Sequence, residues 1–139
     1  MFDDGDPQVV AIAQNLHEKV TPSGVVVWYL VGESLHVVAH TSSPIDRPMD
    51  KVIQPKMSLG HLVCESDKTL VFDDTLSHPL LKDSTAVTVY GVMAYMGAPF
   101  YNAGRVVGGI SAIHQHARRW SNADVNHLEM AAADLSRLI

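Results

Sequence analysis

A predicted hairpin in the last third of the chain constrains the fold more than any other feature. The apolar segments "GVMAYMGAPFY" and "RVVGGISAIH" flank Asn102-Ala103-Gly104, and glycine there makes a backbone with positive φ inexpensive. A three-residue loop pairs Tyr101 with Arg105, and the alternation of side chains along both strands then assigns each residue to one of two faces. The segment therefore predicts two long antiparallel strands.

The two faces of this hairpin differ in character. One face is apolar but ends in an imidazole, and its members are Val92, Ala94, Met96, Ala98, Phe100, Val106, Gly108, Ile110, Ala112 and His114. On the other face, Gly97 falls opposite Gly109 in this register. Two glycines side by side leave a flat spot, where a helix can approach the sheet closely.

Amphipathic helices are predicted at both ends of the chain. Pro7 fits the first helical position and Asp6 can cap it. The apolar residues of this first helix recur at Val9, Ala13, Leu16 and Val20. The closing helix begins at Ser121, with Asp124 in the position of a capping box and Trp120 placed to pack on the first apolar residue. Its apolar positions follow an a/d pattern at Val125, Leu128, Ala132, Leu135 and Ile139.

The chain between these segments contains shorter elements. The predicted series is a strand at 24–32, a strand at 35–42, a loop at 43–55, a short helix at 58–67, a short strand at 69–74 and an irregular, partly helical stretch at 75–91. With the hairpin, this order favours an α+β fold around a central antiparallel sheet of five or six strands. For 139 residues, a single domain over residues 1–139 is expected.

Composition limits the expected partners and compartment. Charged residues make up 18% of the chain and the net charge is −5, with no run of Lys or Arg, so neither nucleic acid nor a membrane is an expected partner. Cys64 is the single cysteine, which excludes an internal disulfide and favours a reducing compartment. No apolar run approaches the roughly 18 residues of a membrane span, and the acidic start "MFDDGDP" differs from a signal peptide. We therefore expect a cytoplasmic chain.

The hairpin and the closing helix together resemble the C-terminal half of a GAF domain. The matching features are the step Gly97-Ala98-Pro99-Phe100, the segment "RVVGGISAI" and the aromatic-capped helix start "RRWSNADV". Upstream, "SLGHLVCESDKTLVFDDTLSHP" is similar to the family's helix, short strand and aspartate-containing loop. The resemblance implies a sheet with the terminal helices on one face, and with loops and short helices roofing a ligand pocket on the other.

This resemblance, together with the two predicted faces of the hairpin, indicates which residues could bind a ligand. The flat spot at Gly97 and Gly109 suits the terminal helices, so we expect the face of His114 to look into the pocket. The candidate ligand-binding residues are His114, Phe72, Asp74, His78, Tyr90 and Met96. Asp74 has a second interpretation, because an aspartate after a short strand commonly caps the next turn.

His114 and His116 raise the question of a metal or a planar cofactor. A His-x-His pair can supply two metal ligands, but no further ligands follow at recognisable spacing, so no metal site is predicted. In the phytochrome branch of the family, a histidine at the end of this strand contacts a bilin. The cysteine that links a bilin falls in a stretch that here is "LKDSTAVTV", so a covalent bilin is not expected. Non-covalent haem or another planar ligand stays open, whereas the signature of cyclic-nucleotide GAF domains is not found.

The resemblance implies a non-catalytic sensory or regulatory module of a bacterial signal-transduction protein, such as a sensor histidine kinase. A small molecule would bind in the pocket, and the closing helix would carry the change to an output domain of the parent protein. A homodimer through the terminal helices is implied by the habit of the family, and the a/d pattern favours it.

Two other functions stay open. The family includes enzymes that reduce free methionine sulfoxide with cysteine pairs, and the one nucleophilic combination in this chain is Cys64 with His61, three residues earlier. A single cysteine cannot form the intramolecular disulfide which that chemistry uses, so a thiol-dependent redox enzyme is the alternative rather than the first prediction. The other alternative is a purely structural dimerisation domain, whose pocket is filled by its own side chains.

Overall fold

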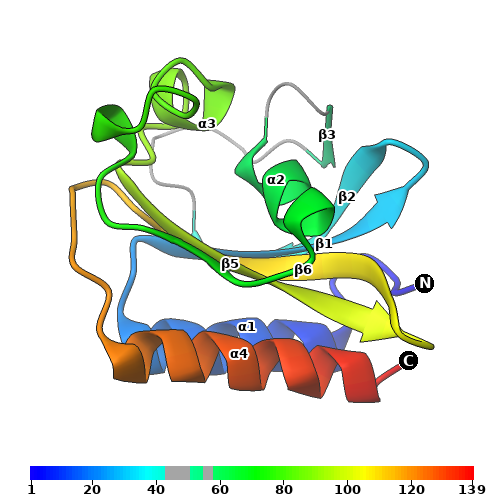
Figure 1. The fold of residues 1–139 in the computed structure, drawn as a ribbon. Coiled ribbons are helices and arrows are strands. Elements are labelled where there is room, and N and C mark those ends of the chain that lie inside the picture. The colour runs from blue at the N-terminus through cyan, green and yellow to red at the C-terminus, as the bar shows by residue number, and fades with distance from the viewer. Residues whose placement is uncertain (43–50, 55–57) are drawn as a thin grey trace.

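The fold is α+β, with a six-stranded antiparallel sheet between two layers of helices (Figure 1). The computed structural model describes residues 1–42, 51–54 and 58–139. The strands, whose order in the sheet is β3-β2-β1-β6-β5-β4, are β1 (Gly24–Val31), β2 (Ser34–His40), β3 (Val52–Ile53), β4 (Leu70–Phe72), β5 (Ala94–Asn102) and β6 (Arg105–His114). The helices are α1 (Pro7–Val20), α2 (Leu59–Ser66), the 3-10 turn η2 (Thr75–Ser77), α3 (Thr85–Thr88) and α4 (Asn122–Arg137).

The two faces of the sheet are covered by different helices. α1 and α4 lie side by side across one face, which we call the helix-side face, and α2 and α3 lie over the other, which we call the cavity face (Figure 1). This arrangement confirms the predicted fold class, with its terminal helices on one side and short helices on the other.

The predicted signals for helix ends form as expected. The Asp6 carboxylate accepts from the backbone N–H groups of Gln8 and Val9, at 2.9 and 3.3 Å, and so caps α1. At the start of α4, Ser121 and Asp124 form a complete capping box, in which each side chain accepts from the other's backbone N–H at 3.0 Å. These bonds satisfy amide groups that a helix end otherwise leaves unpaired.

Both predicted helix stripes pack against the protein's own sheet. The buried members of the stripes are Val9, Ala13, Leu16 and Val20 of α1 and Leu128, Ala132 and Leu135 of α4. Val125 packs partly buried on the same core, whereas Ile139 at the end of the pattern is 43% exposed. Most apolar residues of the two stripes are therefore already buried against the chain's own sheet, without a partner chain.

The hairpin of β5 and β6 forms in a different register from the predicted one. Asn102 pairs with Arg105 across a two-residue turn, in which Ala103 and Gly104 both have positive φ, at 52° and 77°. The ladder then shifts between Phe100 and Tyr101, a bulge that adds one unpaired residue. The predicted three-residue loop, with Tyr101 opposite Arg105, is therefore wrong.

Most residues of each predicted set share a face, but the two faces point the opposite way from the prediction. Val92 packs on the cavity face, and the bulge places Val107 rather than Val106 against the helix-side core. Met96, Phe100 and Ile110 pack on α1 and α4, so the apolar set forms the helix-side face. Gly97 pairs with Ser111 rather than Gly109, and the set that contains both glycines forms the cavity face. A helix does approach the flat spot, because a Cβ on Gly97 would meet Val63 of α2 at 2.8 Å. The approaching helix is α2 rather than a terminal helix.

The stretch predicted as a loop at 43–55 contains a short strand. Val52 pairs with His36 and Ile53 with Leu35, so residues 52 and 53 form β3 at the edge of the sheet. The rest of that predicted loop at 43–50, and its last residue at 55, lie outside the described residues. The stretch at 75–91 is partly helical as predicted, through η2 and α3.

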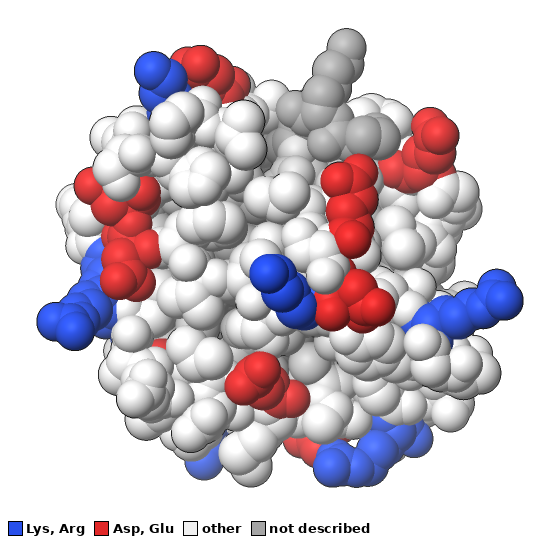
Figure 2. Space-filling model, in the orientation of Figure 1, with Lys and Arg blue, Asp and Glu red and all other residues white. Residues whose placement is uncertain are grey.

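Charged side chains are spread over the surface. On the face shown in Figure 2, acidic and basic groups are interspersed, and no broad basic patch of the kind that binds nucleic acid gathers there. Among the helices that the structure describes, none has the length and apolar character needed to cross a membrane.

Candidate functional site

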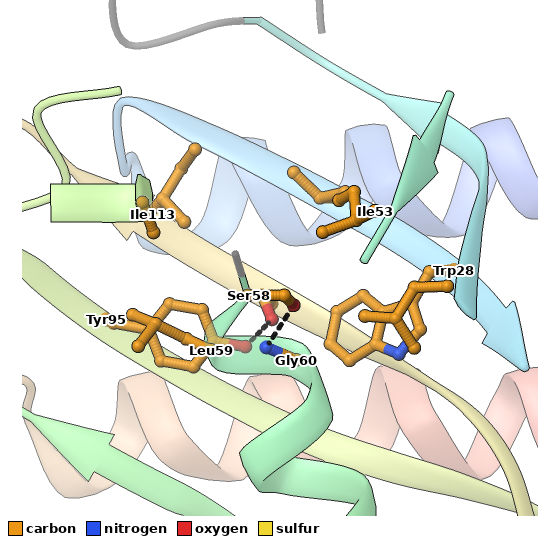
Figure 3. Close-up of a pocket in the computed structure, with 11 residues that line it drawn as sticks. Trp28, Ile53, Ser58, Leu59, Gly60, Tyr95 and Ile113 are labelled. Atoms are coloured by element: carbon orange, nitrogen blue, oxygen red, sulfur yellow. Dashed lines mark hydrogen bonds between the residues drawn. The ribbon is translucent and has the colours of Figure 1, made fainter. Parts of the chain in front are cut away.

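An apolar cavity lies on the cavity face, between the sheet and the start of α2. Its volume within the described residues is about 80 Å³. The lining residues come from five strands of the sheet, from the start of α2 and from α3, and they are Val26, Trp28, Leu35, Ile53, Ser58, Leu59, Gly60, Ala86, Tyr95, Ser111 and Ile113. Figure 3 shows Tyr95 and Trp28 on opposite sides of the start of α2, with Ile113 and Ile53 further along the sheet. None of these lining residues is charged.

Trp28 of β1 is held between two glycines and forms one wall of the cavity. A Cβ on Gly109, its partner on β6, would lie 2.4 Å from Trp28 Cζ2, and a Cβ on Gly60 would lie 3.0 Å from Trp28 Cε2. Both glycines therefore allow a backbone to contact the indole ring closely. The start of α2 is placed by this contact, so the position of the cavity's roof depends on two residues without side chains.

The polar floor of the cavity is a pair of buried hydroxyl groups. The Tyr95 hydroxyl is hydrogen-bonded to Ser111 Oγ, and the two residues are 4% and 2% exposed. The Tyr95 side chain extends along β5 over Gly97, since a Cβ there would meet its hydroxyl oxygen at 2.7 Å. Burial raises the pKa of Tyr95 far above its ordinary value, so the phenol keeps its proton.

Two of the amide groups at the start of α2 are already engaged. Ser58 Oγ accepts from the backbone N–H of Gly60 at 2.9 Å (Figure 3) and from that of His61 at 3.4 Å. The positive end of the helix therefore has its side-chain cap in place at the cavity.

Cys64 lies outside the cavity, in a separate surface groove that it lines with Leu30, Glu33, His61 and Glu65. Burial raises the pKa of the Cys64 thiol, and the Trp28 indole N–H opposes that rise. His61 Nε2 donates to the Glu33 carbonyl oxygen at 2.7 Å, while its Nδ1 and Trp28 Nε1 are buried without a well-formed hydrogen bond among the described residues. A raised pKa leaves Cys64 mainly as the weakly nucleophilic thiol at neutral pH.

Two of the predicted ligand-binding residues lie on the helix-side face. Met96 is fully buried in the core beneath α1 and α4. His114 ends β6 beside that core, where its Nδ1 accepts from the Ser23 backbone N–H at 3.1 Å and hydroxyl at 3.2 Å. The expectation that the His114 face looks into the pocket is wrong, because the terminal helices cover that face. Burial lowers the pKa of His114, and the charges of Arg118 and His116 lower it further.

The other predicted residues lie on the cavity face but do not line the cavity. Phe72 and His78 are brought together, with ring centres 5.3 Å apart in an edge-to-face arrangement. Phe72 and Tyr90 pack at the margin of the apolar cluster on this face. Asp74 caps η2 by accepting from the Leu76 backbone N–H at 3.2 Å, which agrees with its second interpretation. A ligand-binding role for these residues stays a prediction.

A hydrogen-bonded junction connects the cavity face with the terminal helices. The Trp120 indole N–H donates to the Phe72 carbonyl oxygen at 3.2 Å, and the Trp120 backbone N–H donates to Asp73 Oδ1 at 3.2 Å. Arg118 stacks over the Trp120 ring at 4.5 Å and donates to the carbonyl oxygens of Val20, at 2.6 Å, and Thr21, at 3.0 Å, at the end of α1. The segment after β4, the end of α1 and the start of α4 therefore meet at Arg118 and Trp120.

The residues that line the cavity were not among the predicted ligand-binding residues, although the alternation of side chains along the hairpin could have found three of them. Tyr95, Ser111 and Ile113 alternate with the apolar set and share a face with the flat spot at Gly97 and Gly109. That face was assigned to the terminal helices, so its polar members were not considered. Trp28 is only 2% exposed, so it forms part of the apolar core as well as a wall of the cavity.

The planar cofactors considered from the sequence do not fit this cavity. Pockets for drug-sized ligands measure roughly 300–1,000 Å³, and the volume bounded here is about 80 Å³. Neither haem nor a bilin can be buried in that space, and His114, the residue expected to contact such a group, lies on the helix-side face. Among the described residues, no group of three His, Cys, Asp or Glu side chains is arranged to hold a metal ion.

Solved structures with the same fold include enzymes and signalling domains. Residues from 93% of this chain superpose on 74% of a free methionine-R-sulfoxide reductase from Neisseria meningitidis, with 18% identity and a TM-score of 0.76. The GAF domain of an Acinetobacter phosphoenolpyruvate-protein phosphotransferase gives 13% identity and a TM-score of 0.76, covering 94% of this chain and 78% of the other. A domain of a sensor histidine kinase from Sinorhizobium meliloti gives 11% identity and a TM-score of 0.71, covering 99% and 91%.

At these identities the structural likeness establishes the fold alone. Among curated proteins, no sequence matches the chain. The sequence profile of the GAF domain matches residues 8–139, which is nearly the whole chain. Together with the sheet order and the helix layers described above, this match shows that the chain belongs to the GAF domain family.

Proposed function

We propose that the chain is a non-catalytic sensory or regulatory GAF module of a bacterial signal-transduction protein, such as a sensor histidine kinase. It binds a small molecule in the cavity between α2 and the sheet. The observation that carries the proposal is this cavity itself, which has apolar walls, a buried hydroxyl pair and no charged lining residue. Concave apolar sites with a few placed polar groups are the usual form of small-molecule sites.

The junction at Arg118 and Trp120 supports signalling through α4. Phe72 belongs to the apolar cluster that surrounds the cavity, and its carbonyl oxygen accepts from the Trp120 indole one residue before the N-cap of α4. A ligand that favours one position of this cluster shifts the population of positions at the start of α4. The end of α1 moves with it, because Arg118 holds both helix ends.

A homodimer through α1 and α4, and an output domain beyond them, are part of this proposal. The outward side of the helix pair has a groove lined by apolar and charged side chains, including Ile12, His127 and Asp134. Met130, which also lines that groove, is 63% exposed. Packing of two such faces would place paired α4 helices where an output domain can read their arrangement.

The geometry of Cys64 favours this proposal over a thiol-dependent enzyme. Free methionine-R-sulfoxide reductases share the fold, but here the single cysteine lies outside the cavity and its pKa is raised by burial. An attacking thiol works best with a pKa near the ambient pH. The chain should therefore reduce no free methionine sulfoxide with dithiothreitol beyond the rate of Cys64→Ser.

Native mass spectrometry of freshly purified protein tests the proposal. We expect the mass of the chain, or of its dimer, plus a small molecule that is released on denaturation. Ala86→Leu adds bulk to the cavity wall and should lose this molecule. The matched variant Ala123→Leu, on the exposed side of α4, should keep it. A bare chain in every sample would support the purely structural domain, and Cys64-dependent turnover would support the enzyme.

A further inference from the structure

The cavity's walls indicate the charge of its ligand. No Asp, Glu, Lys, Arg or His is among the described lining residues, and six of the eleven are large apolar side chains. An ion moved from water into such a site loses its hydration without gaining a partner. The amide groups of Gly60 and His61 are already bonded to Ser58, so two of the donors that an anion would use at this helix end are engaged. An uncharged ligand is therefore favoured.

The hydroxyl pair indicates a single polar group on that ligand. Tyr95 and Ser111 carry two hydroxyl protons, and the bond between them uses one. The other proton has no acceptor among the described residues, and the phenol does not lose its own because burial keeps Tyr95 protonated. A buried donor left without an acceptor is costly, so a ligand oxygen that accepts this proton is recognised over a purely apolar group.

The size of the cavity limits the group that it can enclose. Its volume of about 80 Å³ is well below the roughly 300–1,000 Å³ of sites that bury a drug-sized ligand, so it encloses one small group. Tyr95 points toward the start of α2 and opposite Trp28 (Figure 3), so the hydroxyl pair lies where such a group would place its polar atom.

We propose that the cavity encloses a small uncharged group of the ligand, and that this group carries one carbonyl or hydroxyl oxygen, which accepts a hydrogen bond from the pair of Tyr95 and Ser111. This assignment rests on the proposed function, because it names the ligand class of the same cavity. It predicts that a carboxylate group binds in the cavity more weakly than an uncharged group of the same shape.

Three molecules of almost the same shape test the assignment. Acetone has the proposed oxygen, isobutene replaces that oxygen with a methylene group, and acetate is an anion of similar size. Each is titrated into ¹⁵N-labelled protein, and the amide shifts of Gly60, Tyr95 and Ser111 give the dissociation constants. We expect millimolar binding of acetone and isobutene, as the few atoms allow, and at least tenfold weaker binding of acetate.

The double variant Tyr95→Phe/Ser111→Ala removes both hydroxyl groups and keeps the cavity apolar. Acetone should lose about tenfold in affinity, the range of one hydrogen bond, whereas isobutene should bind equally well or better. Retained binding of isobutene also shows that the variant is folded. The control Tyr101→Phe removes a phenol that bonds Asp67 outside the cavity, and it should change neither affinity.

The assignment is overturned if acetate binds as well as acetone, if the double variant weakens acetone and isobutene equally, or if neither neutral probe binds. These results would leave the proposed function standing wherever native mass spectrometry still finds a retained molecule that Ala86→Leu removes. If that molecule is missing while acetone binds as described, the recognition chemistry holds and the sensory role fails.

Discussion

The indole ring of Trp28 lies directly over Gly109 of the neighbouring strand, so closely that a Cβ on Gly109 would come within 2.4 Å of Trp28 Cζ2 and 3.0 Å of the Ala98 carbonyl oxygen. Gly109→Ala should therefore lower the free energy of unfolding by about 1–3 kcal/mol, the usual cost of overpacking. Urea denaturation measures this cost. In a Trp28→Leu background the same change should cost at least 1 kcal/mol less, since the ring is gone. Equal costs in both backgrounds would contradict the contact.

Arg118 should contribute more to stability than its neighbour Arg119. It donates to two carbonyl oxygens at the end of α1, contacts Asp124 at 3.4 Å and stacks over Trp120. We expect Arg118→Ala to lower the unfolding free energy by roughly 1–3 kcal/mol, and Arg118→Lys to recover only part of this loss, because an ammonium group lacks the planar fork. Arg119→Ala, at an exposed position, should stay within about 0.5 kcal/mol of the original chain in the same thermal or urea titration.

Acid should destabilise the protein in part through His114. Its folded-state pKa is lowered from 6.5, first by burial and then by Arg118 and His116. As the pH falls below 6.5, the unfolded chain takes up this proton before the folded one does, so the stabilisation present at higher pH is lost as the pH passes through the folded-state pKa. Protonation of Nδ1 also removes the acceptor for Ser23.

Unfolding free energies measured between about pH 7 and pH 5 check this effect. The chain with His114→Gln should lose less stability over that interval than the original chain. His40→Gln, which removes an exposed histidine at the end of β2, should keep the original slope. A slope that is the same with and without His114 would show that its contacts with Ser23 carry no pH dependence.

Cys64 should react slowly with alkylating reagents. Its pKa is raised by burial, which the Trp28 indole opposes only in part, so little thiolate exists at pH 7. We expect iodoacetamide to modify the folded protein at least tenfold more slowly than the urea-unfolded protein. The Trp28→Leu variant would change two things at once, since it removes the indole N–H and also loosens the packing around the thiol. The rate in the folded protein is therefore compared with the rate in the unfolded protein. Equal rates would contradict the raised pKa, and a faster rate in the folded protein would indicate an activated thiol and revive the enzyme interpretation.

The helices and the overall sheet could be predicted from the sequence because their signals are local. Asp6, Ser121 and Asp124 act on backbone groups within a few residues, and the apolar repeat of α1 fixes which side of that helix is buried. The same holds for the two strands of the hairpin, whose side chains alternate whatever surrounds them.

The face of the hairpin that carries the cavity could not be predicted from that alternation. Because side chains alternate between the two faces along a strand, Met96 and Tyr95 must lie on opposite faces. The alternation does not show which of these faces the terminal helices cover. That choice depends on α2, whose Val63 fits the space over Gly97. The register failed for a different reason, since Ala103 adopts a positive φ of 52° that side chains with a Cβ rarely take. The cavity residues were missed as a consequence of these two non-local effects.

The pairing of β1 with β6 joins the first and last strands of the chain at the centre of the sheet, with Gly24 opposite Ile113. A nascent chain on the ribosome therefore holds two separate half-sheets at most until β6 has emerged. Contacts so distant in sequence close a long loop, which slows folding. Stable structure should accordingly appear only after His114, the last residue of β6, has been synthesised, and fragments that end before β6 should be protease-sensitive and exposed to chaperones.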